Sequence, residues 1–415
     1  MIALRVGDVL QRLRAVDLLA VRRVLFVAFV IGLGLSITLS EAAMYALGVL
    51  WVWRLRDPAV RRAQDWPLWQ PMLFFIGATL LAGALSNDPW DSLSYAPEKL
   101  TLPLALYVTA DALDGVEDAA WFISWLTAVT TIAAAIGLLQ VSVCPSSEVD
   151  TGTPRWLYHR CWRARGPFSI YMTLAGVLSL VLLAGLPRLL PGARRRLWFV
   201  PCWLVMLGGL VATYTRGAWI GFAAGVAALL PASRRGRVVL VGALVVLALA
   251  LVAGGERVRQ RALSMGDPED ATVKERVYMW RSGLEMFRLR PWFGYGQGGL
   301  KREYQGFALP EAVQKRTSHV HNAPLQMAIE RGVVGLLAWL SIWITFFWQA
   351  AVRFRRLPQE ATAERGLLMG SVAAIVGFLV GGLTEFNFGD TEVVLIAWAL
   401  MALPYVVTRL SATRR

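Results

Sequence analysis

Hydrophobic runs of roughly 18 or more residues recur along the whole length of this sequence. A run of that length crosses a bilayer as a helix, because a helix satisfies its own backbone hydrogen bonds where no water is present. Hydrophobic residues make up 56% of the 415 residues, against roughly 45–50% in soluble domains. The sequence therefore predicts an all-α polytopic membrane protein. We expect about twelve spans, at residues 24–39, 41–54, 68–86, 99–113, 119–142, 168–187, 197–213, 217–231, 237–254, 333–351, 366–384 and 391–408.

These spans divide the chain into three parts. Residues 1–254 hold the first nine of about twelve expected spans, residues 255–332 form a long, partly helical loop, and residues 333–415 hold the remaining spans. The first apolar run, Val24 to Leu39, is followed at once by a second. We therefore interpret it as a true span rather than as a cleavable signal peptide.

Arginine residues set the expected orientation. The net charge is +14, and even-numbered loops and both ends of the chain are rich in arginine, as at Arg54, Arg188 and Arg353. Cytoplasmic loops of membrane proteins collect basic residues, so these loops and both termini are expected on the cytoplasmic side.

Three expected outer segments break this pattern: loop 143–167, the turn at Arg216 and the long segment 255–332. A long loop crosses the membrane largely regardless of its charge, but the other two segments are short. Their arginines indicate an anionic partner on the outer face, and anionic lipid headgroups are the alternative. Loop 143–167 also holds Cys144 and Cys161, for which a disulfide and two free thiols both stay open.

The stretch "ATYTRGAWIG" (212–221) joins two expected spans by a tight turn. Arg216 lies there at the membrane boundary, near the start of a span. Its planar, permanently charged fork suits phosphate, and the amides at a helix N-terminus also favour anions. The alternative is that Arg216 only reaches past the boundary into water, as interfacial arginines do.

The long outer segment contains "ERVYMWRSGLEMFRLRPWFGYGQGGLKREY" (275–304). Apolar residues recur at helical spacing over 274–289, with Arg276, Arg281 and Arg288 off the apolar stripe. Pro291 ends this expected helix. The following "GYGQGG" has neither a preceding strand nor a following Lys-Ser/Thr pair, so we expect it to shape the backbone rather than to bind a nucleotide.

Two of the three histidines, His319 and His321, stand in "TSHVHNAPLQMAIERGVVG" (317–335). Asn322 is a good helix N-cap, and Pro324 fits a first helical turn. His321 then lies just before a helix N-terminus, which disfavours its charged form and suits a general base. Polar loop residues without a catalytic role are the alternative.

A metal site needs more ligands than these two histidines, and the outer residues offer no set with standard zinc spacing. The acidic stretches "DPED" (267–270) and "NDPWD" (87–91) have oxygen ligands for a divalent cation, but solvated loops are the more ordinary interpretation. We therefore expect no metal site.

Four stretches together resemble the O-antigen ligase and polymerase superfamily of bacterial inner-membrane glycosyltransferases. "TYTRGAW" is similar to its Ser/Thr-x-Ser/Thr-Arg-Gly-x-Trp turn, and "RVYMW…RPWFGYGQGG" to its Arg-x-x-x-Trp helix with Pro-x-x-Gly-x-Gly. "HVHNAPLQMAIERGVVG" resembles its His-x-His-Asn element. "RARGPFSIYMTLA" (163–175) resembles its Arg-x-x-Gly-x-Phe element before a span. The motifs cover about residues 163 to 335, in the family's order.

The resemblance implies a GT-C-like glycosyltransferase in a Gram-negative inner membrane, with its active site facing the periplasm. It implies an undecaprenyl-diphosphate-linked glycan donor, a lipid A-core acceptor in the ligase branch, contact with membrane lipids, and an inverting reaction without metal or cofactor. No nucleic acid is implicated.

The resemblance also gives the candidate residues their roles. His321 is expected to be the general base, with Arg216 and Arg276 stabilising the diphosphate. His319 is expected to orient the base or bind the acceptor, and Glu330 either lies behind the histidines or only pairs with Arg331. Arg163 or Arg165 and Lys99 are the second choices for stabilising the diphosphate, and the further substrate-binding candidates are Arg281, Arg288 and Asn322.

Three rival functions stay open. An O-antigen polymerase shares the chemistry but has a glycan acceptor. An O-linked protein oligosaccharyltransferase resembles the ligase in this loop, but no large soluble domain follows the last expected span. A lipid or glycan transporter predicts charged or broken helices near the bilayer midplane, whereas polar residues here concentrate at the outer rim.

Overall fold

The computed structural model describes residues 2–143, 163–189, 198–230, 234–253, 255–264 and 267–409. Every regular element in this part of the chain is a helix, so the prediction of an all-α membrane protein is confirmed. Cys144 and Cys161, whose pairing the sequence leaves open, lie outside the described residues.

Each of the predicted spans overlaps a helix. These are α1 (Ile2–Leu35), α2 (Ile37–Arg54), α4 (Trp69–Ala84), α7 (Leu104–Ala112), α8 (Val116–Ser142), α10 (Tyr171–Gly185), α11 (Phe199–Ala212), α12 (Arg216–Leu229), α13 (Arg234–Ala253), α17 (Ala323–Arg356), α18 (Thr362–Gly381), and α19 (Thr391–Met401) with α20 (Leu403–Arg409). Within the described residues, six segments are both long and apolar enough to cross a membrane: Leu18–Leu35, Val116–Ser142, Tyr171–Leu189, Ala323–Arg356, Thr362–Gly381 and Thr391–Arg409. The count of twelve spans stays a prediction.

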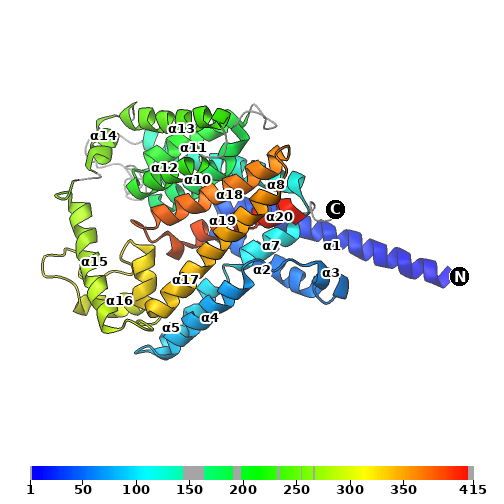
Figure 1. Ribbon diagram of the computed structural model, residues 1–415, viewed down its shortest axis with the longest axis horizontal. Helices are drawn as coiled ribbons and strands as arrows, with labels where there is room; N and C mark the ends of the chain where they lie inside the picture. The colour runs from blue at the N-terminus through cyan, green and yellow to red at the C-terminus, as the bar shows by residue number, and fades with distance from the viewer. Residues whose placement is uncertain are drawn as a thin grey trace.

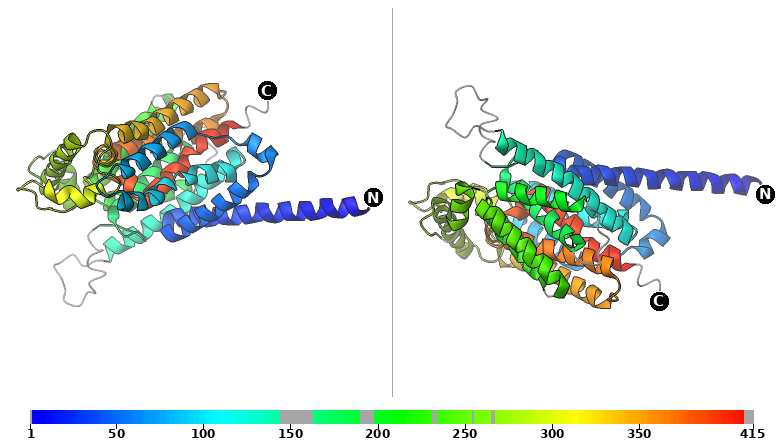
Figure 2. Two further views of the ribbon diagram at one scale, coloured as in Figure 1. Left: turned by 90° about the horizontal axis from the view of Figure 1, so that it is seen from below. Right: turned by 90° about the horizontal axis from the view of Figure 1, so that it is seen from above.

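The remaining described α-helices lie between these segments. They are α3 (Pro58–Ala63), α5 (Pro89–Ser94), α6 (Ala96–Leu100), α14 (Glu256–Leu263), α15 (Ala271–Leu289) and α16 (Gly299–Glu303). In Figure 1, α15, α16 and the start of α17 gather at one end of the bundle, called the site end below. The start of α1 and α20 lie at the opposite end, and Figure 2 shows the same separation from two further sides.

One predicted span, 99–113, is broken into two helices. The chain leaves α6 at Thr101 and starts α7 after Pro103. The acidic end of this segment is neutralised, since Asp111 accepts a hydrogen bond from Arg54 at 2.6 Å and Arg22 donates to the Asp111 carbonyl at 2.7 Å. These contacts allow a carboxylate in a short helix of the bundle.

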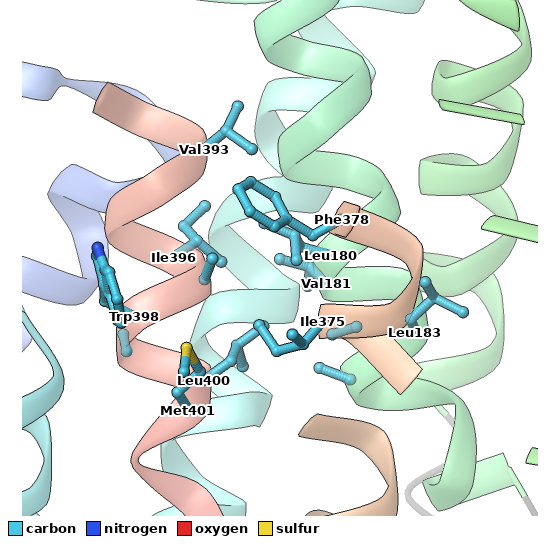
Figure 3. Close-up of a cluster of buried hydrophobic side chains, with 14 of the residues drawn as sticks. Leu180, Val181, Leu183, Ile375, Phe378, Val393, Ile396, Trp398, Leu400 and Met401 are labelled. Carbon is cyan, nitrogen blue, oxygen red and sulfur yellow. The ribbon is translucent and has the colours of Figure 1, made fainter. Parts of the chain in front are cut away.

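The core lies where α10, α18 and α19 meet. Figure 3 shows Leu180 of α10, Phe378 of α18 and Val393 of α19 pointing toward one another, and all three are buried. On the other side of α19, Trp398 stacks on Trp343 of α17 with ring centroids 5.7 Å apart. Lipid is as apolar as these side chains, so close van der Waals packing holds the helices together.

Helices α12 and α18 approach each other closely through glycines. A Cβ added to Gly221 would lie 2.5 Å from the Gly377 carbonyl oxygen, and one added to Gly217 would lie 2.4 Å from the Thr384 hydroxyl oxygen. Small residues permit such contacts between membrane helices. The contact fixes the start of α12 against the loop that follows α18.

Helix α17 is interrupted at Gly332, which has a φ of +64°. The amide of Val333 donates instead to the Pro291 carbonyl at 2.7 Å, and that of Val334 to the Trp292 carbonyl at 3.3 Å. A Cβ on Gly332 would lie 2.1 Å from the Trp292 oxygen. The predicted tenth span, starting at residue 333, begins directly after this kink, whereas the helix itself starts earlier, at Ala323.

The α12–α18 contact gives a stability prediction. Gly221→Ala should lower the thermal unfolding midpoint in detergent, because the added methyl group meets a backbone oxygen, at a cost of about 1–3 kcal/mol. Gly242→Ala on α13 is the matched control, since a Cβ there meets nothing within 4 Å. Equal unfolding midpoints for the two variants would contradict the close packing.

Candidate active site

The two histidines stand directly before α17, as predicted. Asn322 is the N-cap of this helix, with its side-chain oxygen accepting from the Leu325 amide at 2.8 Å. The Asn322 side chain also donates to the Leu383 carbonyl at 2.9 Å, and the Ala323 amide donates to the Gly382 carbonyl at 2.7 Å. Asn322 therefore fastens the histidine segment to the loop after α18.

His321 has a left-handed backbone, with a φ of +50°. A non-glycine residue in this region is strained by about 1–2 kcal/mol, so the neighbouring contacts must hold it there. Its Nδ1 atom lies 3.1 Å from Glu385 Oε2, and the other oxygen of Glu385 accepts from Arg276 Nη2 at 2.5 Å. One carboxylate thus joins the histidine segment to α15.

The environment of Glu385 keeps it ionised. Burial acts to raise its pKa, but the hydrogen bond with His321 and the charge and hydrogen bond of Arg276 lower the pKa below its usual value. A carboxylate only accepts hydrogen bonds, so a neutral His321 carries its hydrogen on Nδ1 and keeps a lone pair on Nε2. That tautomer suits a general base.

The sequence analysis missed Glu385. It lies in "TEFNFGD" (384–390), directly after the predicted span 366–384, and far along the chain from His321. The available signal was a carboxylate and an amide, Glu385 and Asn387, at the expected outer end of a predicted span. Acidic residues are common beside a membrane surface, so this signal did not single out Glu385.

His319 packs against His321, with ring centroids 4.2 Å apart and planes at 84°. Burial, followed by the neighbouring His321, lowers the pKa of His319 to about 4. His319 is therefore neutral at neutral pH and supports the ring of His321 by contact.

A cavity of 340 Å³ adjoins His321 and Glu385 on the side of α12 and α15. We call it the arginine cavity, because its lining includes Arg163, Arg216, Arg261 and Arg276. Burial lowers the pKa of Arg261, and the nearby charges of Arg216 and Arg163 lower it further. The crowding of positive charge makes this cavity suitable for an anion.

The arginines of this cavity differ in their partners. Arg216, the first residue of α12, donates to Asp270 at 3.1 Å and to the Ser264 carbonyl at 2.8 Å. Arg163 stacks over the Tyr171 ring at 4.2 Å and makes no ion pair with the described residues. Arg163, which the sequence analysis ranked below Arg216, is thus the more available cation.

Several predicted substrate-binding residues lie away from the arginine cavity. Arg165 donates to the Ser169 carbonyl at 3.3 Å. Arg281 and Arg288 lie on the exposed face of α15, where Arg288 pairs with Glu285 at 3.4 Å. Arg281 and Arg288 point outward from α15, and Arg165 lies in the loop before α10, so the structure does not bring these three together with His321.

Glu330 pairs with Arg331 at 3.0 Å, one of the two arrangements expected from the sequence. It also accepts from the side chain of Gln326 at 3.0 Å, and Gln326 in turn accepts from the Val320 amide at 3.1 Å. Glu330 therefore lies behind the histidine segment and supports it through Gln326.

A second cavity, of 480 Å³, also adjoins His321 and Glu385, but is lined mainly by residues of α10, of α18 and of segment 385–393; it is called the central cavity. A third, of 590 Å³, continues from it toward α5 and α16 and is called the polar cavity. Lys99 lines both of these and not the arginine cavity, and it donates to the Gly389 carbonyl at 3.1 Å. Lys99, which was predicted to lie near the diphosphate, therefore does not line the cavity that holds the arginines.

The acidic stretches considered for a cation have other partners. Asp270 caps α15 and Asp88 caps α5, while Asp91 pairs with Arg302. Within the described ranges, no three His, Cys, Asp or Glu side chains gather where a metal ion would fit.

Comparison with known proteins finds a similarity over part of the chain. Residues 201–340 match the family model described as O-antigen ligase. The chain is 29% identical over 228 residues to an O-antigen ligase of Pseudomonas aeruginosa PAO1, covering 51% of this chain and 49% of that protein. It is 27% identical over 176 residues to the exopolysaccharide production protein ExoQ of Rhizobium meliloti 1021, covering 39% and 38%.

The chain thus spans about half or less of the length of the curated relatives it matches. The resemblance inferred from the motifs is confirmed for this region, since residues 201–340 match the O-antigen ligase family model, and the long apolar helices fit a multi-pass membrane protein. The matched region contains Arg216, Arg276 and His321, while Glu385 lies beyond it.

The Arg216–Asp270 pair gives a prediction on pH. Burial acts to raise the pKa of Asp270, but the hydrogen bond and charge of Arg216 lower it from 3.8 to about 2. The pair therefore stabilises the fold above pH 3.8, and this contribution is lost as the pH falls toward 2.

Asp270→Asn keeps an acceptor for the α15 cap and removes the charge. It should lower the free energy of unfolding at pH 7 by about 1.5–3 kcal/mol. The difference in unfolding free energy between the variant and the wild type should be smaller at pH 3. If the thermal unfolding midpoints of the variant and the wild type differ equally at both pH values, the ion pair is not the cause of the difference.

Proposed function

We propose that this protein, which carries an O-antigen ligase domain, transfers O-antigen polysaccharide from undecaprenyl diphosphate to a sugar hydroxyl of lipid A-core, completing lipopolysaccharide. The observation that carries the proposal is the His321–Glu385–Arg276 arrangement, which lies where the arginine cavity meets the central cavity. The family match over residues 201–340 supports the same reaction class.

The donor diphosphate is assigned to the arginine cavity. As the bond between the sugar C1 and the phosphate oxygen breaks, its electron pair moves onto the leaving diphosphate. Arg163 and Arg276 stabilise that growing charge by direct contact, and Arg216, held by Asp270, adds its charge. Cations fixed in advance stabilise the transition state more than the ground state.

The acceptor hydroxyl is activated by His321. Its Nε2 takes the hydroxyl proton while the oxygen forms a bond to C1, and ionised Glu385 stabilises the resulting imidazolium. A base in this role contributes roughly 10²–10⁴-fold. His319 supports the ring, and Asn322 positions the segment.

The two cavities that meet at His321 favour an inverting reaction. The acceptor attacks from one side of the sugar while the diphosphate leaves on the other, so C1 changes its configuration. Arginines take the place that a cation has in many diphosphate reactions, and the proposed mechanism uses no metal.

The orientation is part of the proposal. Arg54, Arg188 and Arg353 lie in the last turns of α2, of the short helix after α10 and of α17. The start of α1 lies at the end of the bundle opposite to the site end (Figure 1). Since basic residues favour the cytoplasm, the site end faces the periplasm of a Gram-negative inner membrane and both termini face the cytoplasm.

A polymerase is the second candidate, favoured by the similarity to ExoQ. It would use the same donor cavity and base but a growing glycan as the acceptor. The choice of acceptor in the assay below therefore separates the two functions. A transporter function has less support, because the arginine and central cavities both adjoin His321. A protein oligosaccharyltransferase would differ from the ligase in its acceptor.

The activity prediction uses purified protein, undecaprenyl-diphosphate glycan and lipid A-core, with EDTA present. The wild type should form the joined product, and it should do so equally without EDTA. Product formed only with a glycan acceptor would identify a polymerase, and product abolished by EDTA would refute the metal-free mechanism.

The roles of His321 and Glu385 are tested in the same assay. His321→Ala should lower turnover by roughly 10²–10⁴-fold. Glu385→Gln should also lower turnover, because it removes the charge that stabilises the imidazolium. Lys274→Ala, at an exposed ion pair with Glu269, is the control and should match the wild type. Near-normal turnover of His321→Ala would show that another group is the base.

A further inference from the structure

The central and polar cavities join at their edges. Both are lined by Glu98, Lys99, Ser318, Phe386 and Gly389, so together they form one trough that runs from His321 outward to α5 and α16. The arginine cavity shares Met172, Thr215, His321 and Glu385 with the central cavity and no residue with the polar cavity. His321 therefore lies where the trough meets the arginine cavity.

Charge separates the two sides of His321. The central cavity has the carboxylates of Glu98, Asp390 and Glu392, whereas its cation Lys99 pairs with Glu98 at 2.7 Å. A diphosphate would be repelled there and attracted by the arginine cavity. A saccharide hydroxyl, by contrast, can donate a hydrogen bond to a carboxylate.

The polar cavity has a rigid floor of polar groups. Gln297, Gln326, Glu330 and Arg331 line it, and each of these residues is at most 7% exposed. They bond to one another, with Arg331 donating to Gln297 at 2.9 Å and to Glu330 at 3.0 Å. The same network reaches the histidine segment, because Gln326 accepts from the Val320 amide at 3.1 Å.

The rim of the polar cavity carries donors and acceptors of both charges. Asp88, Tyr95 and Lys301 are exposed there, beside the Arg302–Asp91 ion pair. Opposite charges next to an aromatic ring offer hydrogen bonds in both directions, as the hydroxyl groups of a sugar require. The volume of 590 Å³ lies within the range of ligand cavities, roughly 300–1,000 Å³.

We infer that this trough binds the acceptor saccharide: a hydroxyl-bearing sugar chain, unphosphorylated where it enters the central cavity, held in the polar cavity with its terminal hydroxyl at His321. The inference rests on the proposed function for the role of His321. It assigns the two substrates to cavities that meet at one histidine and makes Tyr95, Lys301 and Ser318 contacts of the acceptor.

Binding without turnover tests the trough separately from the reaction. Lipid A-core is titrated into the purified protein in detergent, with no donor present, and its Kd is measured by thermophoresis. Lys301→Ala should raise the Kd about three- to tenfold, the effect of one lost hydrogen bond. Ser318→Trp should raise it more, since the indole fills the junction of the two cavities.

Two measurements serve as controls. Lys274→Ala, which lines none of the three cavities, should bind lipid A-core as the wild type does. Undecaprenyl diphosphate should bind Lys301→Ala and Ser318→Trp with unchanged Kd, which also shows that both variants are folded. Unchanged lipid A-core binding by both variants, or a loss of donor binding instead, would overturn the inference. Failure of the ligase assay with normal lipid A-core binding would refute the proposed function alone.

Discussion

The carboxylate of Glu385 joins three parts of the chain that are distant in sequence. It belongs to the loop after α18, pairs with Arg276 of α15 and accepts from His321 before α17. Its position depends in turn on the α12–α18 contact, because Gly217 allows α12 to lie directly against this loop. A single buried anion thus fixes the tautomer of the histidine and the place of an arginine together.

The irregular backbone at Gly332 and at the start of α17 lies near the histidine segment. Lipid does not tolerate unpaired backbone groups, so irregular backbone persists only where protein satisfies it. The kink at Gly332 does so through Pro291 and Trp292, and the start of α17 does so through Gly382. The histidine segment is therefore held from two sides, which stabilises the left-handed backbone of His321.

Local features of this chain could be predicted from the sequence. The hydrophobic runs predicted the helices, and Asn322 with Pro324 predicted the start of α17, because capping depends on neighbours in the chain. The partners of the arginines could not be predicted, since the Arg216–Asp270 and Arg276–Glu385 pairs arise from packing between separate elements. The place of Lys99 also depends on packing between separate elements, which is why the sequence did not show that it lies away from the arginines.

The central claim is that His321 and Glu385 separate an anionic donor from a saccharide acceptor. A structure of the protein with undecaprenyl diphosphate bound tests it most directly. The account predicts the diphosphate in the arginine cavity, within hydrogen-bonding distance of Arg163 and Arg276 and next to His321. A diphosphate in the central cavity, beside Asp390 and Glu392, would contradict the assignment of both substrates.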